Sequence, residues 1–294
     1  DVFTYTITDA DGDTSEATIT INLSDTEKPV ASATAAMVDD DGLPLGNEDS
    51  PVAGDESAAD SDSFSGTLNF TKGGDIPVTV SIAAMALAPG NTDTVGTELV
   101  TYEWEEAAST LSARITGGDR DNTILFAVKI TDANNGDYTV NLLQNVLHAD
   151  ADGENNATAT INYVVTDDDG STDDANLTIT FDDDTPVAVD ETAVAAEEAG
   201  VNVGGNVLTN DNQGADRAVE VTGISSNYES AVGTVGSDLA GEFGSLTISA
   251  NGAWTYEPND VVDNDPAAQD VFTYTITDAD GDTSEATITI NLSD

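Results

Sequence analysis

Apolar and polar residues alternate through the first 25 residues of the chain. Phe3, Tyr5 and Ile7 would share one face of an extended segment, and the threonines between them would share the other. The same alternation resumes from Ala17 to Leu23, after a polar loop that contains the pair Asp11-Gly12. Asp-Gly pairs favour the tight turns of hairpins. The pattern therefore predicts two half-buried strands joined as a β-hairpin.

This segment is repeated along the chain. Residues 1–25 recur without a change as residues 270–294, at a spacing of 269 residues. A third, diverged copy aligns without a gap on Ile161–Phe181 after a shift of 158 residues, which places Tyr5 on Tyr163. Unrelated segments do not agree at every position, so we expect the chain to come from a tandem array. Such repetition favours a spacer over a dedicated binding site, which need appear only once.

The repeats also predict the domain organisation. An acidic stretch that contains a proline follows each of the first two hairpins, at Pro29 and at Pro186, and this order marks a domain boundary. We predict that residues 1–25 are the closing hairpin of a preceding repeat, residues 26–184 one β-sandwich, and residues 185–294 another. An isolated hairpin is barely stable in water. We therefore expect residues 1–25 to pack against the middle domain or a neighbouring molecule's sheet.

Short alternating or apolar runs separated by turn signals fill both domains, which predicts an all-β fold of antiparallel sandwiches. No segment reads as a convincing long helix, and Val140–Leu147, the nearest candidate, fits a strand followed by a loop. The strands predicted ahead of the closing hairpins are Phe64–Phe70, Pro77–Ile82, Leu99–Trp104, Leu111–Ile115, Ile124–Ile130, Tyr138–Leu142, Val201–Leu208, Ala218–Ile224, Ser245–Ser249 and Ala253–Tyr256.

Composition adds an extreme charge: 57 Asp and Glu stand against 6 Lys and Arg, a formal net charge of −51. Disorder is the competing interpretation of so acidic a chain, but the alternating runs favour a sheet. The few basic residues are dispersed, which argues against binding a nucleic-acid backbone. Cysteine is absent, so bound hard cations such as calcium would have to supply the restraint that disulfides give elsewhere. No apolar stretch is long enough for direct membrane insertion.

Three segments carry a family resemblance: FTYTITDADGDTSEATITI, NVLTNDNQGAD at Asn206–Asp216, and LTISANGAWTYEPN at Leu246–Asn259. Together they resemble the VCBS and cadherin-like repeats of giant bacterial RTX adhesins. The middle domain, with GDYTVNLLQNVLHADADGENN, resembles the other repeat type of adhesins exported by type I secretion. The chain lacks the glycine-rich nonapeptides of the RTX β-roll, so it does not resemble the secretion-signal end.

The resemblance implies tandem immunoglobulin-like antiparallel β-sandwich domains that bind Ca²⁺. They would form an extender region at the bacterial cell surface and project a distal adhesive tip. The partners would be adjacent repeats of the same chain, and neither nucleic acid nor a small-molecule substrate is expected.

The hairpin loops supply the first candidate calcium ligands. The spacing D-x-D-G-D places three carboxylates around one tight turn, and calcium takes several oxygen ligands. The alternative is a solvated turn in which Asp and Gly merely suit the backbone, and the turns alone do not decide between the two. The ligands predicted here are Asp9, Asp11 and Asp13, Asp278, Asp280 and Asp282, and the diverged pair Asp167 and Asp169, where Ser171 takes the third place.

Acidic clusters at the predicted junctions are stronger candidates, because carboxylates from both sides of a linker can share one ion. Like charges crowded there would be costly without a counter-ion, although a solvated, flexible linker remains the alternative. At the second junction the candidates are Asp182, Asp183, Asp184, Asp190 and Glu191. At the first they are Asp25 and Glu27 with Asp39, Asp40 and Asp41. Two further candidate groups are Asn210, Asp211, Asn212 and Asp216, and Asp150, Asp152 and Glu154.

Catalysis finds little support in the sequence. His148 is the only histidine and cysteine is absent, which excludes Cys-His chemistry. We expect a structural or solvated role for His148 and no enzymatic activity; a polysaccharide-cleaving carboxylate pair is the remote alternative. Trp104 and Trp254 are expected as core anchors, although an exposed Trp beside carboxylates can hold a sugar.

The alternative function is a ligand-binding adhesive module that recognises glycan or ice. The outward threonines of the hairpin form a T-x-T ladder of the kind that ice-binding surfaces also use. Threonine is, however, favoured at solvent-facing positions of any antiparallel sheet.

Overall fold

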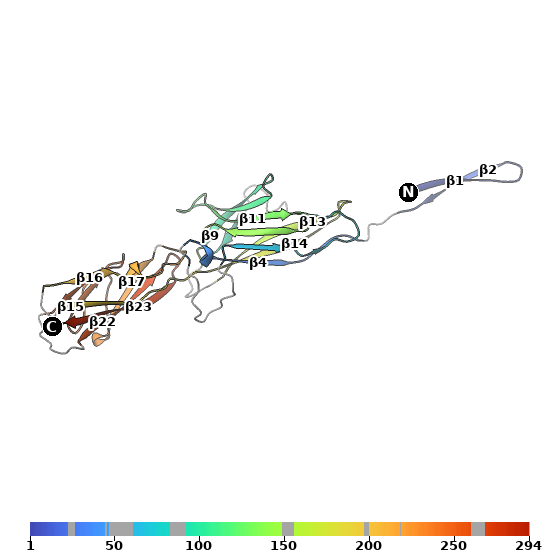
Figure 1. Cartoon of the computed structure of the whole chain (residues 1–294). Coiled ribbons are helices and arrows are strands. Elements are labelled where there is room, and N and C mark those ends of the chain that lie inside the picture. The colour runs from blue at the N-terminus through green and yellow to red at the C-terminus, as the bar shows by residue number, and fades with distance from the viewer. Residues whose placement is uncertain are drawn as a thin grey trace.

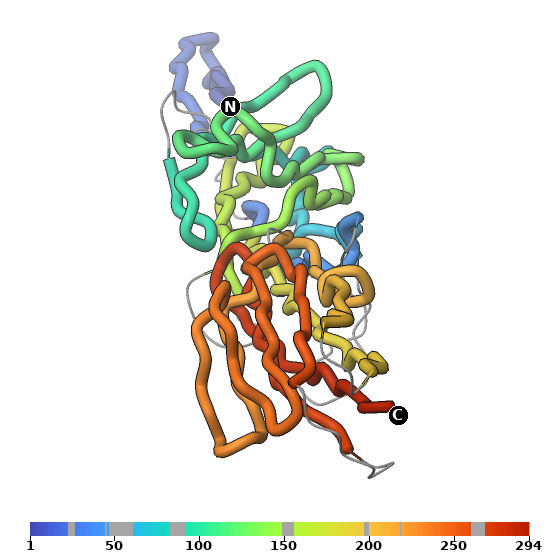
Figure 2. Tube along the Cα trace, turned by 90° about the vertical axis from the view of Figure 1, so that its left-hand side faces the viewer, coloured from blue at the N-terminus to red at the C-terminus, as the bar shows by residue number. Residues whose placement is uncertain are grey.

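The computed structural model describes residues 1–22, 27–44, 46, 61–82, 92–148, 156–196, 200–217, 219–259 and 268–293. These residues form strands and three single-turn 3₁₀ helices, which confirms the predicted all-β class. An N-terminal hairpin, a middle sandwich and a C-terminal sandwich follow one another along one axis (Figures 1 and 2). No described helix is long and apolar enough to cross a membrane.

The middle sandwich packs a six-stranded sheet, in the order β5-β12-β11-β10-β9-β8, against a four-stranded sheet, in the order β4-β14-β13-β7. Phe126 of the first sheet and Phe181 of the second meet in the core, with ring centroids 5.0 Å apart. The strands are β4 (Thr34–Asp39), β5 (Ser63–Thr67), β7 (Thr79–Ile82), β8 (Thr92–Val95), β9 (Glu98–Glu105), β10 (Thr110–Ile115), β11 (Ile124–Asp132), β12 (Asp137–Leu142), β13 (Ala157–Thr166) and β14 (Thr172–Asp182), with a small pair formed by β3 (Val30–Ala31) and β6 (Phe70–Thr71).

The C-terminal sandwich has a core of its own, in which Tyr256 and Phe272 meet edge to face with centroids 6.3 Å apart. Its sheets have the orders β15-β23-β22-β17-β18 and β16-β21-β20-β19. The strands are β15 (Glu191–Ala196), β16 (Val203–Asn206), β17 (Glu220–Ser226), β18 (Ala231–Val232), β19 (Leu239–Ala240), β20 (Gly244–Ile248), β21 (Ala253–Pro258), β22 (Gln269–Thr277) and β23 (Thr283–Ser293).

Both sandwiches close in the same way, with a long hairpin whose last strand pairs in parallel with a strand near the start of the unit. In the middle sandwich β14 pairs with β4, and in the C-terminal sandwich β23 pairs with β15. The hairpins β13–β14 and β22–β23 are the diverged copy and the second exact copy of the repeated segment. In both, the apolar residues of the alternating pattern face the core, which confirms the predicted hairpins.

The N-terminal hairpin is formed by β1 (Val2–Thr8) and β2 (Thr14–Thr20), and every described residue in it is exposed. The prediction that it packs against the middle domain is wrong, since it projects away from that sandwich (Figure 1). The physical reason is that the corresponding place in the middle sandwich is already filled by that unit's own hairpin, β13–β14. Packing against another molecule stays a prediction.

The predicted strands in both sandwiches are largely present, with two exceptions of detail. The run Phe64–Phe70 is divided between β5 and β6, and the run Val201–Leu208 bends into a 3₁₀ turn, Val207–Thr209, capped by the Asn206 side chain. Six short strands were not predicted. Alanine or aspartate residues obscure the alternation in β4, β8 and β15, and β3, β18 and β19 are only two residues long. Val140–Leu147 is strand followed by loop, as predicted.

The two tryptophans take different positions. Trp254 is buried in the C-terminal core, as expected of an anchor. Trp104 packs against the middle core from its edge, and its indole N–H donates to Glu106 Oε2 at 2.7 Å.

Candidate metal centre

Acidic residues from both sandwiches meet where the middle and C-terminal sandwiches adjoin. We call the group formed by Asp40, His148, Asp183, Asp216, Asp278, Asp280 and Asp282 the junction cluster. Three of these residues come from the end of the middle sandwich and its linker: Asp40 opens the 3₁₀ turn after β4, His148 follows β12, and Asp183 follows β14. The other four come from the C-terminal sandwich, and three of them belong to the loop of its closing hairpin.

That loop has the same local structure in all three copies of the repeat. The first aspartate accepts a hydrogen bond at 2.8 Å from the main-chain N–H four residues later, as Asp278 Oδ1 does from Asp282. A glycine with positive φ follows the second aspartate, at +98°, +93° and +113° in the three copies, a conformation that only glycine adopts without strain. The D-x-D-G sequence therefore fixes carboxylates around the turn before any tertiary contact forms.

A main-chain donor and the His148 ring contact the acidic side chains on the middle-sandwich side. Asp40 Oδ2 accepts from the Val146 N–H at 2.7 Å, and this contact brings the turn after β4 to the segment after β12. His148 Nδ1 lies 2.8 Å from Asp183 Oδ1. Asp40, His148 and Asp183 are each almost fully buried, so the three groups face one another away from bulk water.

Direct contacts cross from one sandwich to the other. The His148 N–H donates to Asp280 Oδ2 at 2.9 Å, and the Asn145 side-chain amide donates to Asp216 Oδ1 at 2.5 Å. At the edge of the junction, Arg217 Nη2 donates to the Pro44 carbonyl at 3.3 Å. The linker takes part as well, since Asp184 Oδ2 accepts from the Ala215 N–H at 2.5 Å.

The junction cluster consists of three overlapping groups, in each of which the possible ligand atoms lie within 4.8 Å of one another. The groups are Asp40, His148 and Asp183, then Asp183, Asp280 and Asp282, then Asp216, Asp278 and Asp280. Asp183 belongs to the first two groups and Asp280 to the last two, so the carboxylates form a continuous series across the junction.

Several carboxylate oxygens in this series are buried without a hydrogen-bond partner in the described part of the chain. They are Asp40 Oδ1, Asp216 Oδ2, Asp278 Oδ2 and Asp280 Oδ1. A buried carboxylate oxygen without a donor costs free energy, unless the group takes up a proton or binds a cation. The residues present therefore fit a bound cation.

The pKa values of these carboxyl groups reflect the same crowding. Burial, with the charges of Asp280 and Asp183 added, raises the pKa of Asp216 to about 8, against the opposing effect of the Asn145 hydrogen bond. Burial and the neighbouring Asp280 raise the pKa of Asp278 to about 8. Burial also raises the pKa of Asp40 well above its usual value, with Asp216, Asp183 and Asp184 contributing. Near neutral pH, Asp216 and Asp278 ionise fully only if positive charge is supplied.

His148 can supply part of that positive charge when its imidazole is protonated. Burial by itself lowers the pKa of its imidazole, but the contact with Asp183 and the charges of Asp216 and Asp280 outweigh burial and raise it. In the described ranges, Arg114 forms an ion pair with Glu103 and Arg120 with Glu98. Neither arginine forms an ion pair with a residue of the junction cluster. The expected structural role fits His148, but the sequence did not predict its position in the centre of the junction.

The chemistry of the donors favours a hard divalent cation. All residues of the cluster except His148 offer carboxylate oxygens, which are the ligands that calcium and magnesium take. Calcium accepts six to eight oxygens in a flexible geometry, whereas magnesium demands a nearly ideal octahedron. The second and third groups are purely carboxylate, and they are the better calcium candidates.

One predicted grouping is wrong. Asp39, Asp40 and Asp41 were expected at the first junction with Asp25 and Glu27, whereas Asp40 lies at the second junction with Asp183. The reason is the pairing of β4, which runs parallel to β14 with Asp39 opposite Asp182. Six residues of strand cover roughly 20 Å, so β4 carries these aspartates to the far end of the sandwich. Asp39, Asp41, Asp182 and Asp184 are buried beside the cluster.

The remaining hairpin loops form two smaller groups. Asp167 and Asp169 lie with Asp75 at the opposite end of the middle sandwich, and Asp9, Asp11 and Asp13 lie together in the exposed N-terminal loop. Asp75 was not predicted, because it belongs to no repeat and has no acidic neighbour in sequence. Asn145 was not predicted either, because its acidic partner Asp216 is distant in sequence and meets it only at the junction.

Other predicted ligands make hydrogen bonds outside the cluster, and a metal-binding role for them stays a prediction. Asp211 Oδ1 accepts from the Val189 N–H at 2.7 Å and lies 2.9 Å from the Tyr274 hydroxyl, and Asp190 Oδ1 accepts from the Thr287 N–H at 2.8 Å. Asn212 pairs through its main chain with Val187, and Glu191 interacts with Asn210. Glu27 is exposed and its carbonyl accepts from the Gly74 N–H at 3.2 Å. Asp25, Asp150, Asp152 and Glu154 lie outside the described residues.

Comparison with known proteins gives two sequence matches. Residues 183–294 match the model of the bacterial cadherin-like domain. Over 141 residues the chain is 30% identical to the calcium-binding lectin RapA2 of Rhizobium johnstonii, a match that covers 45% of this chain and 58% of the relative. The chain thus spans little more than half the length of this curated relative.

The solved structures that match are distant from this chain in sequence. Mouse protocadherin-24 EC1-3 is 15% identical, with 99% of this chain and 80% of that chain covered and a TM-score of 0.32. The bradyzoite-specific antigen BSR4 of Toxoplasma gondii is 8% identical, with 92% and 93% covered and a TM-score of 0.36.

Proposed function

We propose that the chain is a calcium-dependent structural extender segment of a long bacterial surface adhesin of the RTX, type I-secreted kind. In this role it would be non-enzymatic and extracellular, and its partners would be adjacent repeats of the same chain. The observation that carries the proposal is the junction cluster, whose carboxylates come from both sandwiches and from the linker between them. The bacterial cadherin-like match and the calcium-binding relative support the same conclusion.

The residues of the junction cluster suit a mechanical role. Asp183 in the linker and Asp280 in the C-terminal loop meet in the second group, so a cation held there would bind both sides of the junction at once. Calcium would supply the positive charge that these buried carboxylates lack. Asn145, His148 and Ala215 already hold the acidic side chains across the junction, so little rearrangement is needed for binding.

Calcium dependence also suits export. Extracellular modules bind calcium with dissociation constants of roughly 10⁻⁴ to 10⁻³ M, which would leave the sites empty in a calcium-poor cytoplasm. The crowded carboxylates would then oppose docking of the sandwiches until the chain reached the outside.

Calorimetric calcium titration together with small-angle X-ray scattering tests this function. We expect binding to more than one site, and a longer, narrower distribution of interatomic distances in calcium than in chelator. The variant Asp183→Asn should lose part of the binding and the extended shape. Asp119→Asn removes the same charge from an exposed loop outside the cluster and serves as the control. Equal scattering curves in calcium and chelator would contradict the extender function.

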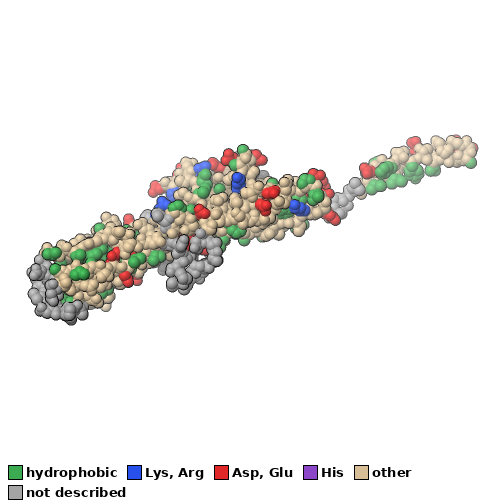
Figure 3. Space-filling model, in the orientation of Figure 1, with side chains coloured by type: hydrophobic (Ala, Val, Ile, Leu, Met, Phe, Trp, Pro, Cys, Tyr) green, Lys and Arg blue, Asp and Glu red, His purple; other side chains and the backbone are tan. Residues whose placement is uncertain are grey.

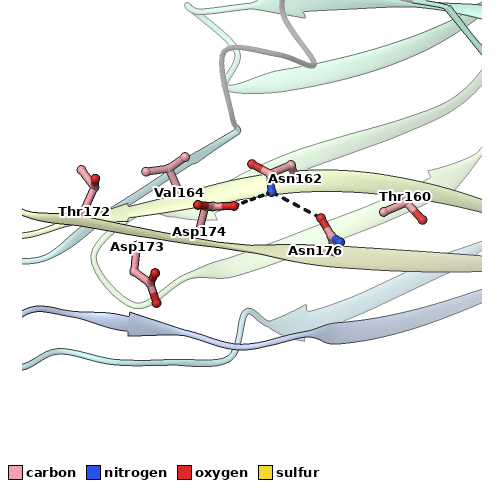
Figure 4. Close-up of a pocket in the computed structure, with 7 residues that line it drawn as sticks. All are labelled: Thr160, Asn162, Val164, Thr172, Asp173, Asp174 and Asn176. Carbon is pink, nitrogen blue, oxygen red and sulfur yellow. Dashed lines mark hydrogen bonds between the residues drawn. The ribbon is translucent and has the colours of Figure 1, made fainter.

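A second candidate function is glycan binding, favoured by the name of the lectin relative and by a polar hollow on the outer face of β13 and β14. There the Asn162 amide donates to Asp174 Oδ2 at 3.1 Å and to Asn176 Oδ1 at 3.3 Å, between Thr160 and Thr172 (Figure 4). Amide, hydroxyl and carboxylate groups of this kind can bind sugar hydroxyls. Retention of the protein on immobilised polysaccharides, lost in the variant Asp174→Ala, would establish glycan binding. Absence of retention would exclude this second function.

A further inference from the structure

The N-terminal hairpin exposes a face that is buried elsewhere in the same chain. Phe3 is 54% exposed and Ile19 is 52% exposed, whereas their counterparts Phe272 and Ile288 are fully buried. Figure 3 shows the apolar side chains gathered along one side of the hairpin. The exposed side chains on this face are Phe3, Tyr5, Ile7, Ile19 and Ile21.

The hairpin already has the geometry of its buried copy. Phe3 lies opposite Ile19 and Tyr5 opposite Ala17, and the second copy pairs Phe272 with Ile288 and Tyr274 with Ala286. The loops also match, with the first aspartate accepting from the N–H four residues later at 2.8 Å in both copies. Only the surroundings differ, so the hairpin needs no refolding to take up the same contacts.

The surroundings of the second copy define what the first copy lacks. In the sheet, β22 is flanked by β17 and β23 by β15, and the opposing sheet supplies Leu246, Trp254 and Tyr256 to the core. Polar contacts are equally specific: Asp270 Oδ2 accepts from the Tyr256 hydroxyl at 2.7 Å and Asp270 Oδ1 accepts from the Glu242 N–H at 2.7 Å. Asp1 is the counterpart of Asp270 in the N-terminal hairpin.

We propose that the apolar face of the N-terminal hairpin is the docking face for a second copy of residues 183–259 of this chain, and that docking rebuilds a complete C-terminal-type sandwich. The hairpin enters between the strands equivalent to β15 and β17, with Phe3 in the place of Phe272 and Asp1 in the place of Asp270. The acceptor copy must lack a hairpin of its own, because β22 and β23 fill this place in the C-terminal sandwich described above.

Docking has a second consequence at the loop. Asp9, Asp11 and Asp13 would occupy the positions of Asp278, Asp280 and Asp282, which face the middle sandwich at the junction. The exposed loop is then one half of a further junction cluster. This docking does not rest on the calcium-dependent function, because it depends on apolar burial and main-chain pairing.

The absence of cysteine gives a direct test. A copy of residues 183–269 is placed ahead of Asp1 in the full chain, and a single cysteine is introduced at Ile19→Cys on the apolar face or at Glu16→Cys on the opposite face. The rate of reaction with a thiol reagent is then measured with and without the added copy, in calcium. The counterpart of Ile19 is fully buried and that of Glu16, Glu285, is exposed, so Glu16→Cys is a matched control on the same strand.

The added copy is expected to slow labelling of Ile19→Cys at least a hundredfold and to leave Glu16→Cys unchanged. Adding Phe3→Asp to the extended Ile19→Cys chain should restore fast labelling, while the circular dichroism of the remaining sandwiches stays the same. Equal labelling of Ile19→Cys with and without the added copy would overturn the proposal. Protection that appears without the added copy and grows with protein concentration would also overturn it, in favour of pairing between hairpins. Neither result bears on calcium affinity, which calorimetry measures separately.

Discussion

The main-chain N–H of His148 donates a hydrogen bond to Asp280 Oδ2 at 2.9 Å, which ties the end of the middle sandwich to the closing loop of the C-terminal sandwich. The imidazole ring of His148 also lies close to the linker, with its Nδ1 2.8 Å from Asp183 Oδ1. One residue thus contacts a carboxylate on each of the two chain segments that must stay in place for the sandwiches to remain aligned.

Asp280→Asn should weaken calcium binding about tenfold or more, because affinity depends on the number of charged ligands and Asp280 belongs to two groups of the cluster. The duplicated segment provides a matched control, Asp11→Asn, which makes the same change in an identical sequence that is exposed. Calorimetric titration of both variants checks this. Equal loss in the two variants would show that the junction has no special part in binding.

Calcium binding should release protons below about pH 8. The pKa of Asp216 in the folded, metal-free chain is raised from 3.8 to about 8, so this group holds a proton at neutral pH that a bound cation would displace. Affinity should therefore rise with pH between about 5 and 8. Titration in two buffers of different ionisation enthalpy measures the released protons, and identical heats in both buffers would contradict the expectation.

In chelator, the stability of the junction should change with pH in the opposite direction. A group whose folded pKa is raised stabilises the fold fully below its unfolded pKa of 3.8, and this contribution is lost as the pH rises through about 8. Thermal melts in chelator should thus show a higher melting temperature at pH 5.5 than at pH 8.5. The difference should shrink in Asp216→Asn, which cannot ionise. A melting temperature that rises with pH in chelator would be inconsistent with protonated carboxylates at the junction.

Phe272→Ala should lower the free energy of unfolding of the C-terminal sandwich by about 3 to 5 kcal/mol, because it removes a fully buried ring that contacts Tyr256. Phe3→Ala in the identical N-terminal segment should leave that free energy unchanged, since Phe3 is exposed. Denaturant unfolding in calcium separates the two variants. A comparable loss in both would mean that the N-terminal hairpin is buried in solution.

Tyr274→Phe should cost about 1 kcal/mol, the usual net contribution of a buried hydrogen bond. The Tyr274 hydroxyl lies 2.9 Å from both the Val189 carbonyl and Asp211 Oδ1, and it fixes the start of the C-terminal sandwich to its core. The control is Tyr5→Phe, which alters the exposed counterpart and should be neutral. The two melting temperatures are compared, and equal values would rule out a stabilising role for this contact.

Local sequence determined the hairpins of this protein and the turns that join their strands. Alternation at Phe3, Tyr5 and Ile7 determined the hairpin and its two faces, and D-x-D-G determined a turn whose first carboxylate accepts a main-chain hydrogen bond in all three copies. Exact duplication revealed the repeat. These features depend on neighbours within a few residues, so they can be read along the chain.

Only the tertiary structure decided which carboxylates meet and which hairpin is buried. Asp40 joins Asp183 because β4 runs parallel to β14, and parallel pairing of distant strands leaves no signature in the residues themselves. Phe3 and Phe272 have identical sequence neighbours for many residues, yet one is exposed and the other is buried. The physical reason is that burial is a property of the partner strands β15 and β17 and of the opposing sheet, which the hairpin's own sequence does not contain.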